Sequence, residues 1–345
     1  MMITVKKKIR VLVVDDSIMF REFLIRGIGE DSLIEVVASA ADPYMARDKI
    51  LEFAPDVMTL DVEMPRMSGI QFLKKLMPQY PLPVVVVSAV SENIFDALNA
   101  GAVDFVAKPA VKSPQSREMF IRELIVKLKI AATAKVGHLK REYANGQHTT
   151  GTVSLQRDRI IAIGASTGGT EAIYEIIRSF SRDMPGVVVV LHMPPGFTGM
   201  YAKRLNNLCL MEVKEAETGD AVTPGRVLLA PGDHHMRLNR KGKIYTVECF
   251  TGDKVNGHCP SVDVLFNSVA EKAGSAAIGV ILTGMGFDGA KGLLKMKQAG
   301  ANTIGQDEQS SVVYGMPKVA YDIGAVGKRV PLERIARQIY AFVNE

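Results

Sequence analysis

One short segment of this sequence has the residue types of a nucleophilic site. Residues 164–168 read Gly-Ala-Ser-Thr-Gly; they follow an apolar run and precede a segment with helical periodicity. This G-x-S-x-G pattern is typical of a sharp strand-to-helix turn that exposes the serine oxygen, with a helix N-terminus behind it to stabilise negative charge. We therefore predict that Ser166 is a nucleophile. The spacing also fits a phosphate- or dinucleotide-binding loop, although both G-x-G-x-x-G and GK[ST] are lacking.

A serine nucleophile needs a base, and the base needs a carboxylate that orients it. His192 directly follows the apolar run 187–191, so we expect it at a strand C-terminus, as for Ser166. Asp288 follows another apolar run through a Gly-rich turn and is our preferred carboxylate. The chain order Ser, His, Asp differs from that of α/β-hydrolases, so that fold is not implied. The weaker candidates are His234, His235 and His258 for the base, and Asp220, Asp233, Asp253 and Asp307 for the carboxylate.

A second group of residues is acidic. Asp15 and Asp16 follow the aliphatic run 11–14, and Asp61 ends another short apolar run. Three carboxylates at one sheet edge repel one another and favour a hard cation with oxygen ligands, which predicts Mg²⁺. Ser88 and Lys108 end two further predicted strands, and a hydroxyl and an ammonium there suit a phosphoryl group. Each feature alone also fits an ordinary helix cap or loop.

These residues need parallel sheets to bring them together, because the carboxyl ends of parallel strands share one edge. In the first part of the chain, short β-branched runs alternate with amphipathic stretches, which predicts a doubly wound α/β domain over residues 1–130 with a five-stranded parallel sheet. The expected strands are 10–14, 34–38, 57–60, 84–88 and 104–107, with helices over 17–29 and 117–130.

The second part of the chain repeats this alternation. Residues 131–152 lose periodicity and are predicted to be a linker, and residues 153–345 form a second, Rossmann-like α/β domain. The expected strands are 159–163, 186–191, 227–230, 244–248 and 277–283. The residues 239–242 between two extended runs predict a hairpin turn, so we expect this sheet to have an antiparallel edge.

Composition excludes several classes of protein. The chain has 345 residues, 47% of them hydrophobic, which suits two packed cores and excludes a disordered chain. Its net charge of +5 is not concentrated in one segment, so we expect no nucleic-acid partner. The aliphatic runs are far shorter than the ~20 residues of a membrane span, so we expect no membrane insertion. Three cysteines without a C-x-x-C pair argue against a disulfide framework and favour a cytoplasmic protein.

Residues 8–128 resemble the receiver domain of two-component response regulators, which has a flavodoxin-like fold. The resemblance rests on VLVVDDS at 11–17, on MTLDVEMPRMSG at 58–69 and on the serine and Lys-Pro at the later strand ends. It implies that Asp61 is the phosphoacceptor. The other implied roles are Mg²⁺ binding by Asp15, Asp16, Asp61 and the Glu63 backbone carbonyl, the switch hydroxyl of Ser88, phosphate binding by Lys108, and an aromatic switch at Phe105.

Residues 154–345 resemble the catalytic domain of chemotaxis protein-glutamate methylesterases, through GASTGG, LHMPPGFTG, APGDHH and LTGMGFDGA. The resemblance implies Ser166 as nucleophile, His192 as base and Asp288 as its orienter. It also implies the Met285 backbone amide as one oxyanion donor, with Thr167 beside the nucleophile as a second. Ester hydrolysis then needs no metal, and Mg²⁺ belongs to the receiver alone.

The family's substrates are γ-glutamyl methyl esters, and certain glutamines, on the cytoplasmic helices of chemoreceptors. The resemblance further implies a chemotaxis histidine kinase as phosphodonor and a receiver that covers the esterase site until it is phosphorylated. Two rival interpretations stay open at this point. They are a receiver with a DNA-binding output and a receiver with a catalytically inactive scaffolding output.

Overall fold

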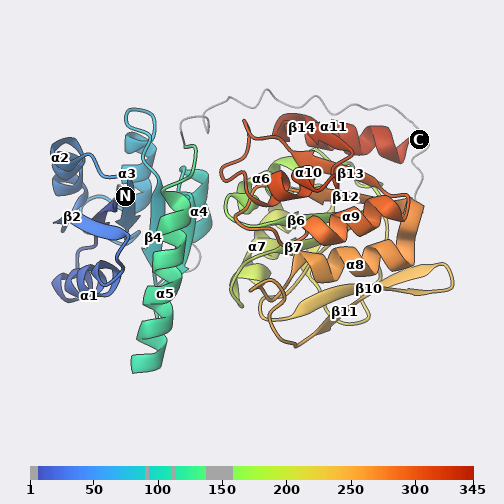
Figure 1. The fold of residues 1–345 in the computed structure, drawn as a ribbon, viewed down its shortest axis with the longest axis horizontal. Coiled ribbons are helices and arrows are strands. Elements are labelled where there is room, and N and C mark those ends of the chain that lie inside the picture. The colour runs from blue at the N-terminus through green and yellow to red at the C-terminus, as the bar shows by residue number, and fades with distance from the viewer. Residues whose placement is uncertain (1–6, 90–92, 110–112, 137–157) are drawn as a thin grey trace, which may run out of the picture. The chain divides into compact units, whose positions relative to one another are not determined.

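The computed structural model describes residues 7–89, 93–109, 113–136 and 158–345. The chain divides into two compact units, Met1–Arg141 and Glu142–Glu345, and each unit contains its own parallel sheet (Figure 1). The predicted linker, 131–152, falls mostly outside the described residues and stays a prediction. No helix in the described ranges is both long and apolar enough to cross a membrane.

The first unit is the predicted five-stranded parallel sheet, with strand order β2-β1-β3-β4-β5. Its central strands β3 and β4 are completely buried and almost entirely apolar, as expected where helices cover both faces of a sheet. The direction of the chain reverses between β1 and β3, which creates a crevice at their carboxyl ends. The strands are β1 (Ile9–Val14), β2 (Ile34–Ala40), β3 (Val57–Leu60), β4 (Val84–Ser88) and β5 (Asp104–Ala107).

The helices of the first unit begin at caps that the sequence supplies. Ser17, Asp42, Ser68 and Ser113 each accept a backbone N–H bond at a helix start. Helices α1 and α5 pack together through the rings of Phe20, Phe23 and Phe120. Right-handed crossovers put α1 on the opposite face of the sheet from α2, α3 and α4, and α5 lies on the same face as α1. The helices are α1 (Ile18–Gly29), α2 (Pro43–Phe53), α3 (Gly69–Leu76), α4 (Ile94–Asn99) and α5 (Pro114–Ala131).

The second unit contains a seven-stranded sheet with order β14-β13-β12-β6-β7-β9-β8, and every strand pair in it is parallel. The chain runs outward from β6 to β8 and then returns to β12 on the other side of β6. The crevice of this sheet therefore lies between β6 and β12. The strands are β6 (Ile160–Ala165), β7 (Gly186–Leu191), β8 (Glu212–Glu215), β9 (Arg226–Leu229), β12 (Ala277–Ile281), β13 (Asn302–Gln306) and β14 (Lys328–Val330).

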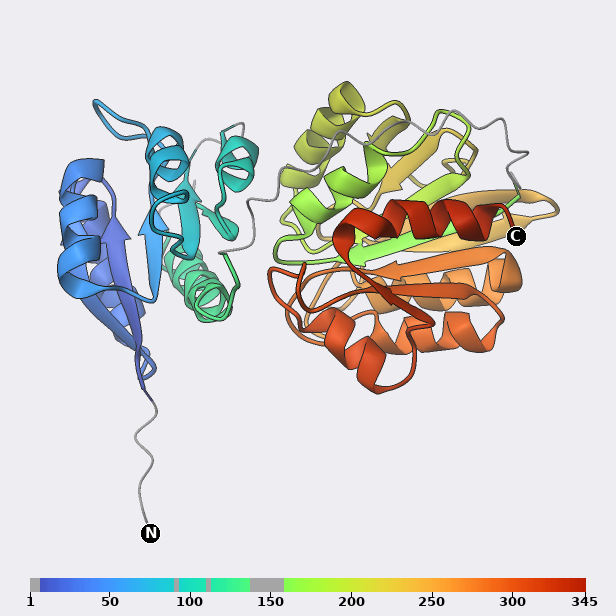
Figure 2. The ribbon, with the colours of Figure 1, turned by 90° about the horizontal axis from the view of Figure 1, so that it is seen from above.

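Helices cover both faces of this second sheet (Figure 2). One layer contains α6 (Gly169–Ile177), α7 (Phe197–Leu208) and α11 (Leu332–Val343); the other contains α8 (Val262–Ala273), α9 (Ala290–Gln298) and α10 (Met316–Asp322), with a 3-10 turn, η1 (Gly274–Ala276), after α8. The core between the sheet and the second layer includes Val262, Phe266, Leu293 and Met316, all fully buried.

The predicted hairpin is present, but the expectation of an antiparallel edge on the large sheet is wrong. Strands β10 (His235–Lys241) and β11 (Ile244–Phe250) form a separate two-stranded sheet. The reason is the loop after β8, which pairs with β11 in place of a strand: the Gly219 and Val222 N–H groups donate to the Val247 and Tyr245 carbonyls, each at 2.9 Å.

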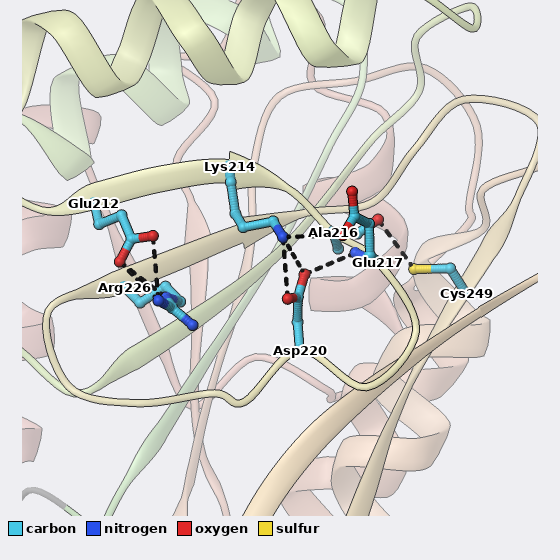
Figure 3. Close-up of polar contacts among 7 residues, drawn as sticks. All are labelled: Glu212, Lys214, Ala216, Glu217, Asp220, Arg226 and Cys249. Carbon is cyan, nitrogen blue, oxygen red and sulfur yellow. Dashed lines mark hydrogen bonds and ion pairs between the residues drawn. The ribbon is translucent and has the colours of Figure 1, made fainter.

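Side chains hold this loop between the two sheets (Figure 3). Lys214 on β8 makes an ion pair with Asp220 at 2.9 Å, and the thiol of Cys249 on β11 lies 3.5 Å from the Ala216 carbonyl. On the same two edge strands, Arg226 on β9 donates hydrogen bonds from both Nε and Nη2 to the Glu212 carboxylate on β8. The end of the sheet is thereby closed by charged groups rather than by another strand.

Candidate functional site

The crevice of the first sheet brings the predicted acidic residues together. Val14 and Leu60 are paired in the parallel register, so Asp15 and Asp61 follow at adjacent strand ends. Lys108, after β5, donates to Asp15 Oδ2 at 2.8 Å and to Asp61 Oδ2 at 2.6 Å. Both carboxylates are buried, whereas Asp16 is exposed.

The charged groups in this crevice shift one another's pKa values. Burial raises the pKa of Asp15 although Lys108 opposes that rise. Burial lowers the pKa of Lys108, but its hydrogen bonds to Asp15 and Asp61 outweigh that effect and raise it overall. The two buried carboxylates of Asp15 and Asp61 thus share the single ammonium of Lys108.

A divalent cation fits the donor set of this crevice. Oxygens of Asp15, Asp16 and Asp61 lie within 4.8 Å of one another, close to the span of an octahedral Mg²⁺ shell. The N–H of Glu63 donates to Asp61 Oδ1 at 3.2 Å, which places the Glu63 backbone beside the same carboxylate. Its role as a carbonyl ligand stays a prediction.

The two predicted switch residues are buried near this crevice. Ser88 is fully buried at the end of β4, and Phe105 on β5 is only 3% exposed. The Lys127 ammonium donates to the Phe105 carbonyl and lies 4.9 Å from the centre of its ring. Sequence reasoning missed Arg21, whose guanidinium donates to the backbone carbonyls of Asp15 and Asp16 at 2.7 and 3.1 Å.

Ser166 occupies the predicted strand-to-helix turn in the second unit. Strand β6 ends at Ala165, and α6 begins at Gly169 after Gly168, whose φ of +78° favours glycine. The Ser166 N–H donates to the Thr283 carbonyl at 3.0 Å, across the crevice between β6 and β12. A Cβ atom on Gly284 would lie 2.7 Å from Ser166 Cβ, so only glycine permits this close approach.

His192 and Asp288 converge beside this turn. Ala165 and Leu191 are paired, and the His192 N–H donates to the Ala165 carbonyl, so Ser166 and His192 follow adjacent strand ends. His192 Nε2 lies 2.9 Å from Asp288 Oδ2. His192 Nδ1 is buried and has no hydrogen-bond partner among the described residues. Within the same ranges, no hydrogen bond joins the Ser166 hydroxyl to His192.

Asp288 also occupies the N-terminus of α8. Its carboxylate accepts the Val262 N–H at 2.6 Å and the Ser261 hydroxyl at 2.8 Å, while Ser261 makes no side-chain cap of its own. Asn256 Nδ2 donates at 2.7 Å to Oδ1, the same oxygen that accepts the Ser261 hydroxyl. Burial alone would raise the pKa of Asp288, but the bonds from His192, Asn256 and Ser261 hold that pKa well below its usual range. The Asp288 carboxylate is therefore charged at neutral pH.

The predicted oxyanion donors flank Ser166. Thr167 is buried, and its carbonyl accepts the Thr283 hydroxyl at 3.0 Å. Met285 follows Gly284, which contacts Ser166, and the Met285 side chain is 46% exposed. The Thr167 amide lies in the turn between β6 and α6, and the Met285 amide lies in the loop after β12. Their role in binding an oxyanion stays a prediction.

The weaker candidates have other partners. His235 accepts the Ser261 N–H and bonds the Asp253 carbonyl, and is buried between them. Asp220 makes an ion pair with Lys214, and the Asp307 carboxylate accepts the Ser310 backbone N–H. His234 Nδ1 lies 3.2 Å from the Gly232 carbonyl, and Asp233 is exposed in a loop.

Sequence reasoning underrated one neighbour and missed two. The ring of His258 stacks on His192, and Asn256 and Ser261 bind Asp288. The signal that could have found His258 and Asn256 is the dipeptide Asn256-Gly257, which is typical of a tight turn between extended segments. No local signal marks Ser261 as anything but a helix cap.

Comparisons with known proteins identify the families to which the two units belong. Residues 161–339 match the CheB methylesterase family, and residues 11–117 match the response regulator receiver domain. A protein-glutamate methylesterase/protein-glutamine glutaminase 2 of Syntrophomonas wolfei is 59% identical over 98% of this chain and 99% of its own length. The protein of the same activity from Salmonella typhimurium is 48% identical over 98% and 97%. The crystal structure of the Thermotoga maritima CheB methylesterase catalytic domain, 40% identical, superposes with a TM-score of 0.52 over 53% of this chain and 97% of its own.

Proposed function

The chain belongs to the CheB family of protein-glutamate methylesterases/protein-glutamine glutaminases with a receiver domain, and from this premise we propose that Ser166, His192 and Asp288 perform the ester hydrolysis. The observation that carries the assignment is the 2.9 Å contact between His192 Nε2 and Asp288, beside the turn that presents Ser166. The rival DNA-binding and scaffolding outputs lose their support, because the second unit matches a methylesterase family.

The contact with Asp288 decides which nitrogen acts as base. Nε2 carries the proton that bonds the carboxylate, so Nδ1 is the free acceptor. During turnover Nδ1 takes the Ser166 proton while Oγ bonds the ester carbonyl carbon. The proton then passes to the departing methoxide, which leaves as methanol, and water hydrolyses the acyl-enzyme by the same route. The hydroxyl and Nδ1 must come into contact when substrate binds, as is common for catalytic hydrogen bonds.

Charge in the tetrahedral intermediate falls on the former carbonyl oxygen. We assign its stabilisation to the Met285 backbone amide and to Thr167, together with the N-terminus of α6. The glycine at 284 supports this assignment, because it lets the loop after β12 approach Ser166.

We propose γ-glutamyl methyl esters on the cytoplasmic helices of chemoreceptors as the substrate. Deamidation of certain receptor glutamines follows the same acyl-enzyme path, with ammonia leaving in place of methanol. The names of the relatives support both activities. We place this chemistry in the cytoplasm.

In the receiver we propose Asp61 as the phosphoacceptor and a chemotaxis histidine kinase as the donor. Lys108, already bonded to Asp61, would neutralise phosphoryl oxygens, and Ser88 and Phe105 would respond to them. Asp15, Asp16, Asp61 and the Glu63 carbonyl would hold Mg²⁺, which when bound supplies charge neutralisation during phosphoryl transfer. Ester hydrolysis uses residues of the second unit only.

We also propose that the unphosphorylated receiver inhibits the esterase. A phosphoryl group adds roughly two negative charges beside Asp15 and Lys108, which changes the surface that the receiver presents. The shift toward the active form is limited by the difference in interaction energy between the two states.

Methanol release from methylated receptor membranes tests the esterase assignment. Ser166→Ala and His192→Ala should each abolish it, with a far-UV circular dichroism spectrum like that of the wild type. Ser275→Ala, a serine exposed in η1, is the matched control and should release methanol at the wild-type rate. Wild-type turnover in His192→Ala together with loss of turnover in His234→Ala would refute the assignment of the base.

A further inference from the structure

A tight turn lies against the proposed catalytic histidine. Val255 and His258 exchange two backbone hydrogen bonds, each of 3.0 Å. Between them, Asn256 has a φ of +54° and Gly257 a φ of +86°. Two successive positive φ values in an Asn-Gly pair are the pattern of a type I′ turn, which is narrow and well defined. The turn therefore fixes the directions of both Asn256 and His258.

Two residues of this turn, Asn256 and His258, each contact one member of the Asp288–His192 pair. Asn256 Nδ2 donates to Asp288 Oδ1 and to Asp263 Oδ2, both at 2.7 Å. The His258 ring lies on the His192 ring, with 3.6 Å between centroids and 7° between planes. A separation of 3.6 Å is full van der Waals contact of two parallel rings.

The surroundings of the His258 ring favour its uncharged form. Burial, and then the neighbouring His192, lower the pKa of His258 to about 4, although Asp288 opposes that change. At neutral pH a flat, neutral ring thus covers one face of His192. Such a face attracts a cation and excludes water from it.

The stack supplies a constraint that the hydrogen bond to Asp288 does not. A single bond at Nε2 fixes one atom of the imidazole, but the ring can still rotate about that contact. Nδ1 has no partner among the described residues that would stop this rotation. A parallel ring in contact with the whole imidazole fixes its plane, and with it the direction of Nδ1.

We propose that His258 is a positioning residue, which stacks on His192 to hold its plane toward Ser166 and to stabilise it while it carries the serine proton. The proposal rests on the proposed role of His192 as base. Because the stack acts through shape and aromatic character, a phenylalanine at position 258 should replace the histidine. An alanine or a glutamine should not.

The test uses the full-length chain with methylated receptor membranes, without phosphodonor. We expect His258→Ala and His258→Gln to lower kcat about tenfold, the effect of losing a partly desolvated cation–π contact, with an unchanged receptor concentration for half-maximal rate. His258→Phe should return kcat to within about threefold of the wild type. A residue with only a structural role would not give a kcat-only effect that an aromatic ring rescues.

His234→Ala is the matched control, because within the described ranges that histidine bonds only a nearby backbone carbonyl in its own loop. Thermal unfolding midpoints of all variants identify loss of fold, and His258→Phe keeps the test valid should His258→Ala unfold. Wild-type kcat in His258→Ala, or a kcat in His258→Phe as low as in His258→Ala, would overturn the proposal. His192→Ala is measured in parallel: if it retains activity, the proposed base is wrong, whereas its inactivity beside a fully active His258→Ala rejects the stacking role alone.

Discussion

Glu171 lies in the first turn of α6, directly behind the turn that carries Ser166, and its carboxyl is predicted to weaken the fold above neutral pH. Burial, and then the neighbouring Glu175, raise its pKa from 4.5 to about 7, although Arg178 and Arg204 oppose the rise. We expect the substitution Glu171→Gln to stabilise the second unit at pH 8.

The sign follows from proton linkage. Below pH 4.5 the carboxyl is protonated in both the folded and the unfolded chain, so it does not disfavour folding. Between pH 4.5 and about 7 the unfolded chain loses this proton first, and stability falls as pH rises. The shift is equivalent to about 3 kcal/mol at 1.36 kcal/mol per pH unit, and partial solvent access reduces the expected effect to roughly 1–3 kcal/mol.

Urea unfolding at pH 5 and pH 8, followed by far-UV circular dichroism, measures this effect. The transition that the substitution shifts is that of the second unit, because Glu171 lies in this unit. The quantity of interest is the free energy of unfolding of Glu171→Gln minus that of the wild type. This difference should be larger at pH 8 than at pH 5 by roughly 1–3 kcal/mol. Any effect of the substitution that does not depend on pH cancels.

Glu271→Gln is the matched control, since Glu271 is an exposed glutamate near the end of α8. Its stability difference should be equal at the two pH values. A difference for Glu171→Gln that is constant, or that shrinks as pH rises, would refute the reasoning that burial keeps this carboxyl protonated.

Four further predictions concern the two sites. Asp288→Ala should lower the free energy of unfolding of the second unit by roughly 2–4 kcal/mol as well as slow turnover, because buried donors of Ser261 and Val262 lose their acceptor; unchanged urea stability would contradict this. Gly284→Ala should lower kcat about tenfold or more by displacing Ser166; a wild-type kcat would show that the loop after β12 accommodates the added methyl group without displacing Ser166. Asp61→Asn should abolish acid-labile labelling by a small phosphodonor with Mg²⁺, and EDTA should block labelling of the wild type; label retained in either case would reject Asp61 or the metal requirement. Fragment 153–345 should release methanol faster than the unphosphorylated full chain, and phosphodonor with Mg²⁺ should accelerate the full chain; equal rates in all three would exclude an inhibitory receiver.

The parts of the fold that were predictable are those where local pattern and burial agree. Strands such as Val57–Leu60 and Gly186–Leu191 are buried at every position and almost entirely apolar because both faces are covered, and their predicted bounds are confirmed. The interior strand β13 was missed because Asn-Thr-Ile-Gly-Gln mixes polar and apolar residues, and the edge strands β8 and β14 were missed too. They contain Glu-Val-Lys-Glu and Lys-Arg-Val, whose polar side chains remain in contact with water, so no hydrophobic run marks them.

The site divides in the same way. Ser166, His192 and Asp288 could be proposed because each follows a predicted strand, and parallel sheets gather these ends at one edge. Their neighbours could not. Ser261 and Asp288 are 27 residues apart and meet only because α8 packs beside the loop after β12, which no local pattern specifies. The hairpin was predicted from its turn, but its separation from the large sheet depends on the loop after β8.

The attachment of Asp288 to the start of α8 has a consequence for how the enzyme loses activity. Fraying of the first turn of this helix withdraws donors from the carboxylate and disturbs the group that orients His192. Inactivation should therefore precede global unfolding and accompany the local opening of α8. Exchange of the Val262 amide hydrogen would report that opening directly, and the urea or temperature at which it accelerates should coincide with the decline in methanol release. The operating limits of this esterase would then be set by the stability of one helical turn rather than by that of the whole domain.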